Sequence, residues 1–254
     1  MDAFGALTRR RGTLSYAALP APHRPAPPLD ATTQFLLVAP VLLFSLVAHE
    51  YAHGYAALKQ GDRTALQLGR LTFNPVKHID PFMTVLVPLM LYFTGGPIFG
   101  GAKPVPVETR NFKHFKRGDI IVSLAGVATN LVLAPICALL VVALGAVGRG
   151  VPALQPSLAI LQLMMLYGVL VNLTLAVFNL LPLPPLDGSR VFKYLLPPAW
   201  AMQYQQLGRF GFLLLFLLLS FGNGFMQRWM APAYSLFGAA QRAAGPFLLP
   251  NPLA

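Results

Sequence analysis

The sequence predicts an all-α polytopic integral membrane protein with four to six transmembrane helices. Apolar residues make up 56% of the 254 residues and charged residues only 11%, whereas about 25% of a soluble domain is charged. So few charges cannot cover a soluble surface of this size, although they suffice for a surface that faces lipid. Five apolar runs separated by basic loops supply the spans, and four of them reach the roughly 20 residues that a helix needs to cross the hydrocarbon.

The first 33 residues form a polar, proline-rich segment ahead of the apolar runs. This segment holds the basic cluster Arg9–Arg11 and the prolines between Pro20 and Pro28. The stretch after the arginines is too short and too interrupted by proline for the apolar region of a signal peptide. We therefore expect a flexible basic tail over 1–33, a membrane-embedded domain over 34–226 and an interfacial C-terminal segment over 227–254.

The apolar runs follow one another along most of the chain. They cover residues 35–58, 82–99, 120–147, 158–183 and 207–225. The second run contains Pro88, is the shortest and ends in Gly-Gly-Pro, so we expect a re-entrant or hairpin element there. A soluble helical bundle is excluded because Leu213–Leu219 is apolar around its whole circumference and offers no polar face.

The net charge of +11 arises mainly from basic residues in the loops. Nine of these residues lie between the first and third runs, at Lys59, Arg63, Arg70, Lys77, Lys103, Arg110, Lys113, Lys116 and Arg117. Only Arg149 lies between the third and fourth runs, and this contrast predicts that the long basic loop is cytoplasmic. The four arginines of the tail would then lie outside, so both orientations stay open. No loop alternates basic with aromatic residues, and nucleic-acid binding is therefore not expected.

The clearest chemical signal is the sequence His49-Glu50-Tyr51-Ala52-His53 inside the first apolar run. On a helix, positions i and i+4 share a face, so His49 and His53 can both reach one metal ion. Glu50 projects beside them, where it can hold and deprotonate a water at the metal. A glutamate inside a membrane helix costs about 2.5 kcal/mol or more unless it faces a partner or a wet cavity. The pattern therefore predicts a hydrolytic metal site within the membrane.

A third metal ligand is expected, because catalytic zinc sites take three protein ligands and leave one position open. Asp187 is the only acidic residue after Asp119. It follows the fourth apolar run, and the prolines at 182, 184 and 185 break the helix and can turn it back toward the membrane. An Asp before Gly188 is equally typical of a simple turn. The histidine pair upstream favours Asp187 as the third ligand.

The combination of these two motifs resembles the site-2 protease family of intramembrane metalloproteases. An HExxH in a membrane helix is followed, more than a hundred residues later, by Asn179-Leu-Leu-Pro-Leu-Pro-Pro-Leu-Asp187-Gly188, and the resemblance covers about Phe35 to Tyr194. It implies that His49, His53 and Asp187 bind one Zn²⁺ and that Glu50 is the general base. It also implies a three-helix catalytic core formed by the first, third and fourth runs.

Two loop segments, Leu68–Pro81 and Phe99–Val107, resemble further motifs of one branch of the family. In the family, the second of these lies near the active site and pairs with extended substrate. Val105 and Val107 alternate with prolines, which permits only an edge strand. We therefore expect a short β or re-entrant element between the first and second core helices, able to bind substrate by strand addition.

Ala125–Asn130 in the third run resembles a family motif of a small residue and an asparagine near the zinc, although Val127 stands where many relatives have proline. Asn130 is a candidate catalytic residue, because an amide there can stabilise the oxyanion of the reaction. A hydrogen bond between helices is an equally good explanation of a membrane asparagine. Gly126 would then only allow close helix packing.

Three other polar residues receive no chemical role. His78 and His114 lie in basic loops without a helical partner, so we expect them to be solvated or interfacial. Asn172 is expected to form a hydrogen bond between packed helices.

The sequence thus predicts an intramembrane zinc metalloprotease that hydrolyses peptide bonds in or near transmembrane segments of membrane-protein substrates. The resemblance suggests a regulatory membrane protein, such as an anti-sigma factor, as substrate and a bacterial inner membrane as the location. Two alternatives stay open, a non-proteolytic zinc-binding scaffold and a small membrane transporter. The scaffold would bind zinc without turnover, and the transporter would hold no stable metal.

Overall fold

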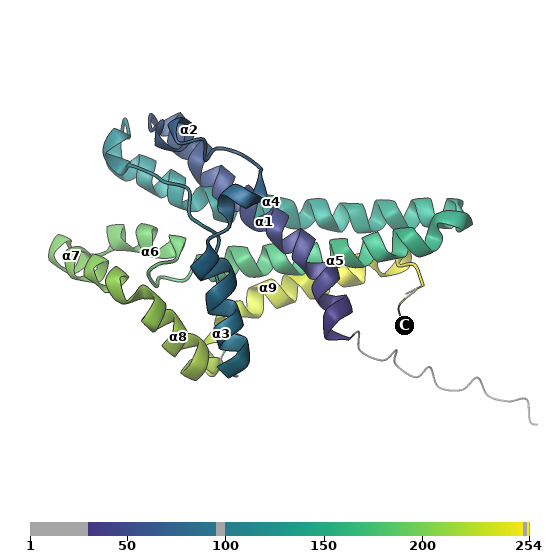
Figure 1. Cartoon of the computed structure of the whole chain (residues 1–254). Coiled ribbons are helices and arrows are strands. Elements are labelled where there is room, and N and C mark those ends of the chain that lie inside the picture. Colours follow the sequence, from purple (N-terminus) through teal and green to yellow (C-terminus); the bar gives the residue numbers. More distant parts are fainter. Residues whose placement is uncertain (1–29, 95–99, 251–252, 254) are drawn as a thin grey trace, which may run out of the picture.

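A computed structural model describes residues 30–94, 100–250 and 253. Its helices (Figure 1) are α1 (Ala31–Gln60), α2 (Thr64–Gln67), α3 (Val87–Thr94), α4 (Phe115–Gly150), α5 (Gln155–Asn179), α6 (Asp187–Phe192), α7 (Pro198–Gln206), α8 (Gly211–Phe221) and α9 (Asn223–Ala244). No β-strand occurs among the described residues. Most of the predicted tail and the end of the predicted second apolar run lie outside the described residues.

In the part of the chain that the structure describes, four helical stretches are long and apolar enough to cross a membrane. They are Ala31–Gln60, Phe115–Gly150, Pro152–Asn179 and Pro198–Phe221. They coincide with the first, third, fourth and fifth apolar runs, which confirms the predicted all-α polytopic architecture. The second run instead begins with the π-helical turn Pro81–Leu86 and continues into the short helix α3.

Helix α1 owes its limits to residues at its two ends. The Asp30 carboxylate accepts hydrogen bonds from the backbone N–H groups of Thr32 and Thr33, each 3.0 Å long, and so caps the first turn. The helix ends at Gly61, whose φ of 111° lies in the left-handed region that glycine adopts without strain. These limits give α1 thirty residues, with the His49–His53 segment in its second half.

The helices α1, α4, α5 and α9 form the packed body of the molecule. Helices α4 and α5 run side by side as an antiparallel pair, α1 crosses them, and α9 lies along α5 (Figure 1). The largest buried cluster joins α4, α5 and α9 through Ala134, Cys137, Val169, Leu173, Met230 and Ala233. The prediction that residues 227–254 lie on the membrane surface stays a prediction, while the structure packs α9 against α5.

The chain between α1 and α4 returns to the middle of α1 as an extended segment, Gly100–Glu108. Lys103 donates its backbone N–H to the His78 carbonyl at 2.8 Å, and Gly101 donates to the Met83 carbonyl at 3.2 Å. The prediction that His78 is solvated was wrong: its ring is 2% exposed and its Nε2 lies 2.9 Å from the Thr72 carbonyl. Packing of the loop around its own backbone groups buries this histidine, whereas His114 is exposed as expected.

After α5 the chain turns at a proline-rich bend and enters α6 at Asp187. Prolines 182, 184 and 185 lack the N–H that would continue α5, so the bend reverses the chain direction as the sequence predicts. Lys193, just beyond α6, places its Nζ 2.6 Å from the carboxylate of Asp119 on α4. The bend and this ion pair together fix α6 beside α4.

Candidate metal centre

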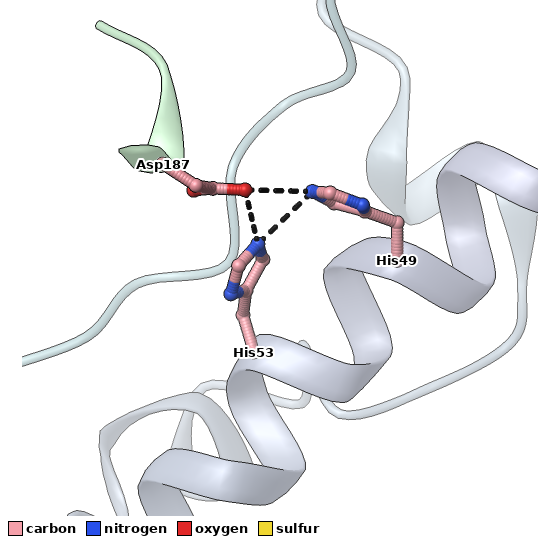
Figure 2. A group of neighbouring side chains, drawn as sticks. All are labelled: His49, His53 and Asp187. Atoms are coloured by element: carbon pink, nitrogen blue, oxygen red, sulfur yellow. Dashed lines mark hydrogen bonds and ion pairs between the residues drawn. The ribbon is translucent and has the colours of Figure 1, made fainter. Parts of the chain in front are cut away.

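His49 and His53 lie one turn apart on α1, and their side chains point to the same place as that of Asp187 (Figure 2). The Nε2 atoms of the two histidines are 3.0 Å apart. The Asp187 Oδ2 atom lies 3.1 Å from His49 Nε2 and 3.2 Å from His53 Nε2. The structure thus brings together three residues from two segments that are more than 130 positions apart in the sequence.

The three donor atoms suit a single zinc ion. They all lie within 4.8 Å of one another, and a tetrahedral ion with ligands at about 2.1 Å holds its donor atoms roughly 3.4 Å apart. Two imidazole nitrogens and one carboxylate oxygen are also the donor set of catalytic zinc sites that keep one position open. Geometry and donor chemistry therefore both fit zinc.

The outer nitrogen of each imidazole contacts an acceptor on α4. His49 Nδ1 lies 2.5 Å from Asn130 Oδ1, and His53 Nδ1 lies 2.7 Å from the Val122 carbonyl. Each acceptor requires a proton on Nδ1, which leaves the lone pair of Nε2 free for a metal. Helix α4 therefore sets both the tautomer and the orientation of the two histidines on α1.

Gly126 provides the space in which the two imidazoles meet α4. A Cβ atom at this position would lie 2.5 Å from the Nε2 atoms of both His49 and His53. Any other residue would therefore push the rings out of place. The sequence left two explanations of this motif open, a place near the zinc or close helix packing alone, because nothing in the local pattern shows which side chains face Gly126.

Asn130 lies behind His49, on the side away from the three donor atoms. Its amide donates to Asn172 Oδ1 at 2.8 Å, and the Asn172 amide donates to Ser45 Oγ at 2.9 Å. All three side chains are at most 1% exposed. This buried chain of hydrogen bonds joins α4, α5 and α1, as expected of a polar network inside a packed helix bundle.

Glu50 lies next to the donor atoms. It lines the same cavity as His49, His53 and Asp187, a space of about 140 Å³. Its carboxylate accepts a hydrogen bond of 2.8 Å from the backbone N–H of Val105. The extended segment therefore passes directly over the candidate base.

A buried charged cluster that sequence patterns did not reveal holds α6 in position. Asp119 is 2% exposed, and besides its ion pair with Lys193 it accepts a hydrogen bond of 2.8 Å from the Tyr194 hydroxyl. Burial and the Asp119 carboxylate together raise the pKa of Tyr194 above its ordinary value, so the hydroxyl stays a donor. Nothing in the sequence indicated that Asp119 holds α6, because an acidic residue near the start of a helix after a basic loop is ordinary.

Comparisons with known proteins agree with this geometry. The family described as "Peptidase family M50" matches residues 151–219. The "Putative zinc metalloprotease YwhC" of Bacillus subtilis is 40% identical over 188 residues, which cover 74% of this chain and 82% of that protein. The "Putative zinc metalloprotease Rip2" of Mycolicibacterium smegmatis is 31% identical, covering 76% of this chain and 70% of that protein. Its counterpart in Mycobacterium tuberculosis strain H37Rv is 30% identical, covering 85% and 80%.

No solved structure matches the chain. A match that covers 85% of the chain is long enough that it must include both the histidine pair and Asp187. Among the described residues, four helices long and apolar enough to cross a membrane accompany a donor set that suits zinc. On these grounds the chain belongs to peptidase family M50, the site-2 protease family, and is an intramembrane zinc metalloprotease.

Proposed function

We propose that His49, His53 and Asp187 hold the zinc ion and that Glu50 is the general base of peptide-bond hydrolysis. The observation that supports this most strongly is the convergence of the three donor atoms within 4.8 Å on a cavity that Glu50 also lines. Zinc bound there would polarise the scissile carbonyl and increase the acidity of the attacking water.

Glu50 carries the proton in this mechanism. Its carboxylate exchanges the Val105 N–H for the attacking water and accepts one proton from it, while the water oxygen bonds to the carbonyl carbon. When the C–N bond breaks, Glu50 returns that proton to the leaving amine. The products are one carboxylic acid and one amine, and the base is restored.

We propose a positioning role for Asn130 in place of oxyanion stabilisation. Its amide oxygen contacts His49 Nδ1 and its amide nitrogen donates to Asn172, so neither group is directed at the scissile carbonyl. Asn130→Ala should weaken zinc binding by about ten- to a hundredfold, as the loss of such supporting contacts does elsewhere. Unchanged zinc affinity would overturn this role.

We propose that the substrate is a membrane protein whose transmembrane segment unwinds at the site. A helical backbone uses its carbonyls in internal hydrogen bonds, so the scissile bond must first become extended. The extended segment Gly100–Glu108 offers backbone groups beside Glu50 for strand addition. Because the relatives are bacterial, we place the enzyme in the inner membrane of a bacterium, with a regulatory membrane protein such as an anti-sigma factor as substrate.

The first test measures zinc per chain in purified protein, for the wild type and for His53→Ala and Asp187→Ala. One zinc in the wild type, lost or weakened in both variants, is the expected result. Zinc retained in Asp187→Ala would remove this residue from the ligand set.

The second test concerns turnover. Glu50→Gln should keep its zinc and lose cleavage of membrane-reconstituted transmembrane peptides, measured by mass spectrometry of the products. Full cleavage by Glu50→Gln would overturn the mechanism. Zinc binding without cleavage of any peptide by the wild type would favour a non-proteolytic scaffold.

A further inference from the structure

Three cavities meet at the proposed active site. The metal cavity, of about 140 Å³, is lined by the proposed ligands and Glu50. The apolar cavity, of about 360 Å³, shares His49 and Glu50 with it, and the polar cavity, of about 410 Å³, shares Val107 with it. Pro185 and Arg190 line all three. The cavities therefore adjoin one another, and the proposed zinc site lies between the apolar and the polar cavity.

The two ends of this path of adjoining cavities differ in chemistry. The apolar cavity is walled largely by Leu46, Met83, Leu175, Phe178, Phe212 and Leu215. The polar cavity is walled largely by Thr109, Asp119, Ser189, Lys193, Tyr204 and Gln205. A peptide lying along the path thus leaves an apolar environment and enters a polar one as it crosses the zinc site, as a transmembrane segment does at its end.

The extended segment follows the same path in chain order. Gly100–Ala102 line the apolar cavity, Pro104 and Val105 line the metal cavity, and Val107 and Thr109 line the polar cavity. A substrate strand added to this segment would therefore have its apolar residues beside Gly100 and its polar residues beside Thr109.

Arg190 is the cation at the junction of the three cavities. It lies three positions after Asp187 on α6, so the two side chains share a helix face. Within the described part of the chain, the Arg190 side chain makes no hydrogen bond, ion pair or ring contact, and the residue is exposed. A guanidinium left without a partner beside a substrate path is available to a ligand.

The acids along the path are already occupied. Glu50 accepts from Val105, Asp187 contacts the two imidazoles, and Asp119 is paired with Lys193. None of these carboxylates pairs with Arg190. Its guanidinium is therefore free to meet an acidic group that a substrate brings into the path.

We propose that Arg190 determines specificity by binding a carboxylate side chain of the substrate, on the polar side of the scissile bond. A planar guanidinium binds carboxylate through two parallel hydrogen bonds. The preferred substrate is a membrane protein with Asp or Glu close to the scissile bond, on the side of that bond that lies in the polar cavity. The acidic residue stands within roughly three residues of the bond, or about 10 Å of extended chain. This inference rests on the proposed function, because it takes the zinc site as the point of cleavage.

The test uses three synthetic peptides with an apolar segment of about 20 residues and a polar tail that begins with Glu, Gln or Lys. Their binding to zinc-loaded Glu50→Gln protein in detergent micelles is measured by fluorescence anisotropy, so that no cleavage interferes. The Glu peptide should bind about tenfold more tightly than the Lys peptide, as expected for a charge-assisted contact. Arg190→Gln in the same background should abolish the preference, and Arg190→Glu should reverse it.

Arg110→Glu is the matched control. Arg110 lies in the basic loop before α4, has a side chain that is 91% exposed, and lines none of the three cavities. The preference for the Glu peptide should survive this change. Zinc content is measured in every variant, so that a loss of the metal site is separated from a loss of the carboxylate contact.

Two results would overturn the proposal. An unchanged peptide ranking in both Arg190 variants would show that the guanidinium does not contact the tail. An equal loss of affinity for all three peptides would show that Arg190 contacts backbone carbonyls, as Arg70 does with the carbonyls of Lys103 and Pro104. Cleavage by the wild type is scored separately, so that a failure of the proteolytic function is distinguished from a failure of this subsite.

Discussion

The imidazoles of His49 and His53 on α1 pack against α4 at Gly126, which has no side chain. Each ring has a fixed outer contact, His49 with Asn130 and His53 with Val122, so neither can move without losing a hydrogen bond. The space beside them is set by Gly126 alone. On the proposed ligand set, zinc affinity at the residue scale therefore depends on Gly126, which offers no ligand atom.

Gly126→Ala is predicted to lower zinc affinity by at least about tenfold, comparable to the loss of a supporting contact. The added Cβ would lie 2.5 Å from both Nε2 atoms, which forces the rings apart. Zinc affinity is measured by competition with a chelator of known strength.

Gly150→Ala is the matched control for this prediction. Gly150 lies on the same helix, and no atom lies within 4 Å of the position that an added Cβ would take. Alanine also favours the helix, so this variant should keep the zinc affinity of the wild type. Equal zinc affinities of the two variants would contradict the steric explanation.

The sequence predicts the candidate metal ligands better than the residues that hold those ligands in place. The spacing of His49 and His53 is a property of one helix, so it is readable locally, and Asp187 follows because few acids remain. Gly126 and Asn130 act through α4, and the helix pairing that brings them to α1 is a tertiary event. The roles assigned to Asp119, Lys193 and Arg190 likewise depend on tertiary neighbours that no local pattern encodes.

At the scale of elements, the carboxylate of Asp62 links the end of α1 to the start of α2 and to the loop before α4. Asp62, 1% exposed, accepts hydrogen bonds from the backbone N–H of Thr64 at 3.0 Å, from the Asn111 amide at 2.9 Å and from the Glu108 N–H at 2.8 Å. It thereby fixes the end of the extended segment that passes over Glu50.

Asp62 also makes stability depend on pH. Burial opposes ionisation, but the hydrogen bonds from Thr64, Asn111 and Glu108 outweigh it and hold the pKa of Asp62 below its usual 3.8. A depressed pKa stabilises the fold at pH values above 3.8, and that contribution is lost as the pH falls through the folded-state pKa.

Asp62→Asn should therefore destabilise the protein at pH 7 by about 2 kcal/mol, since it removes charge-assisted hydrogen bonds, and should flatten the acid limb of the stability curve. Thermal unfolding in detergent between pH 7 and pH 2 measures both effects, because the series must extend below the usual pKa of 3.8. Glu108→Gln, at an exposed carboxylate, is the control. An acid limb as steep in Asp62→Asn as in the wild type would assign it to other groups.

The ion pair between Asp119 and Lys193 fastens α6, and with it Asp187, to α4. Asp119→Leu should destabilise the protein by about 3–5 kcal/mol, because it leaves the Lys193 ammonium poorly solvated and unpaired. The double variant Asp119→Leu with Lys193→Met should recover most of that loss, because an apolar pair replaces an ion pair at little cost. Unfolding free energies and zinc affinities of the wild type and the two variants test this, and a double variant no more stable than the single one would argue against the pair.

Helices were predicted with uneven success, and the reasons are physical. The first, third and fourth apolar runs are each long and apolar enough to predict a membrane helix from sequence alone, so α1, α4 and α5 were expected and found. Helix α9 was not expected as a helix, because Pro232, Arg228 and Arg242 interrupt its apolar pattern; it forms where Met230 and Ala233 pack against α5. The β part of the predicted element after α1 has no counterpart among the described residues.

At the scale of the whole molecule, the two ends of the helix bundle differ in charge. The basic loop leads into α4, whereas the turn between α4 and α5 lies at the far end (Figure 1). Helix α4 has 36 residues, or about 54 Å at 1.5 Å per residue, which exceeds the roughly 30 Å of the hydrocarbon. Because Lys116 and Arg117 are charged, we expect the excess length at this end, with these first turns in the headgroup region.

We predict that the basic end faces the cytoplasm. The test starts from Cys137→Ser, which removes the single cysteine, and introduces Lys113→Cys at the basic end or Ala153→Cys at the other. A thiol reagent that cannot cross membranes should label Ala153→Cys in intact cells and Lys113→Cys only in inverted vesicles. The opposite labelling pattern would reverse the topology and put the tail inside.

The hydrogen bond between Glu50 and the Val105 N–H has a consequence for how the protease behaves between encounters. In the structure the base already has a partner of its own chain, so on the proposed mechanism a resident enzyme is latent. An intact helix keeps its amides in its own hydrogen bonds, so it offers no strand that could pair with Gly100–Glu108 and release Glu50 from Val105. On the proposed mechanism, one bond within the chain thus favours substrates that have already unwound over the intact helices of the bilayer.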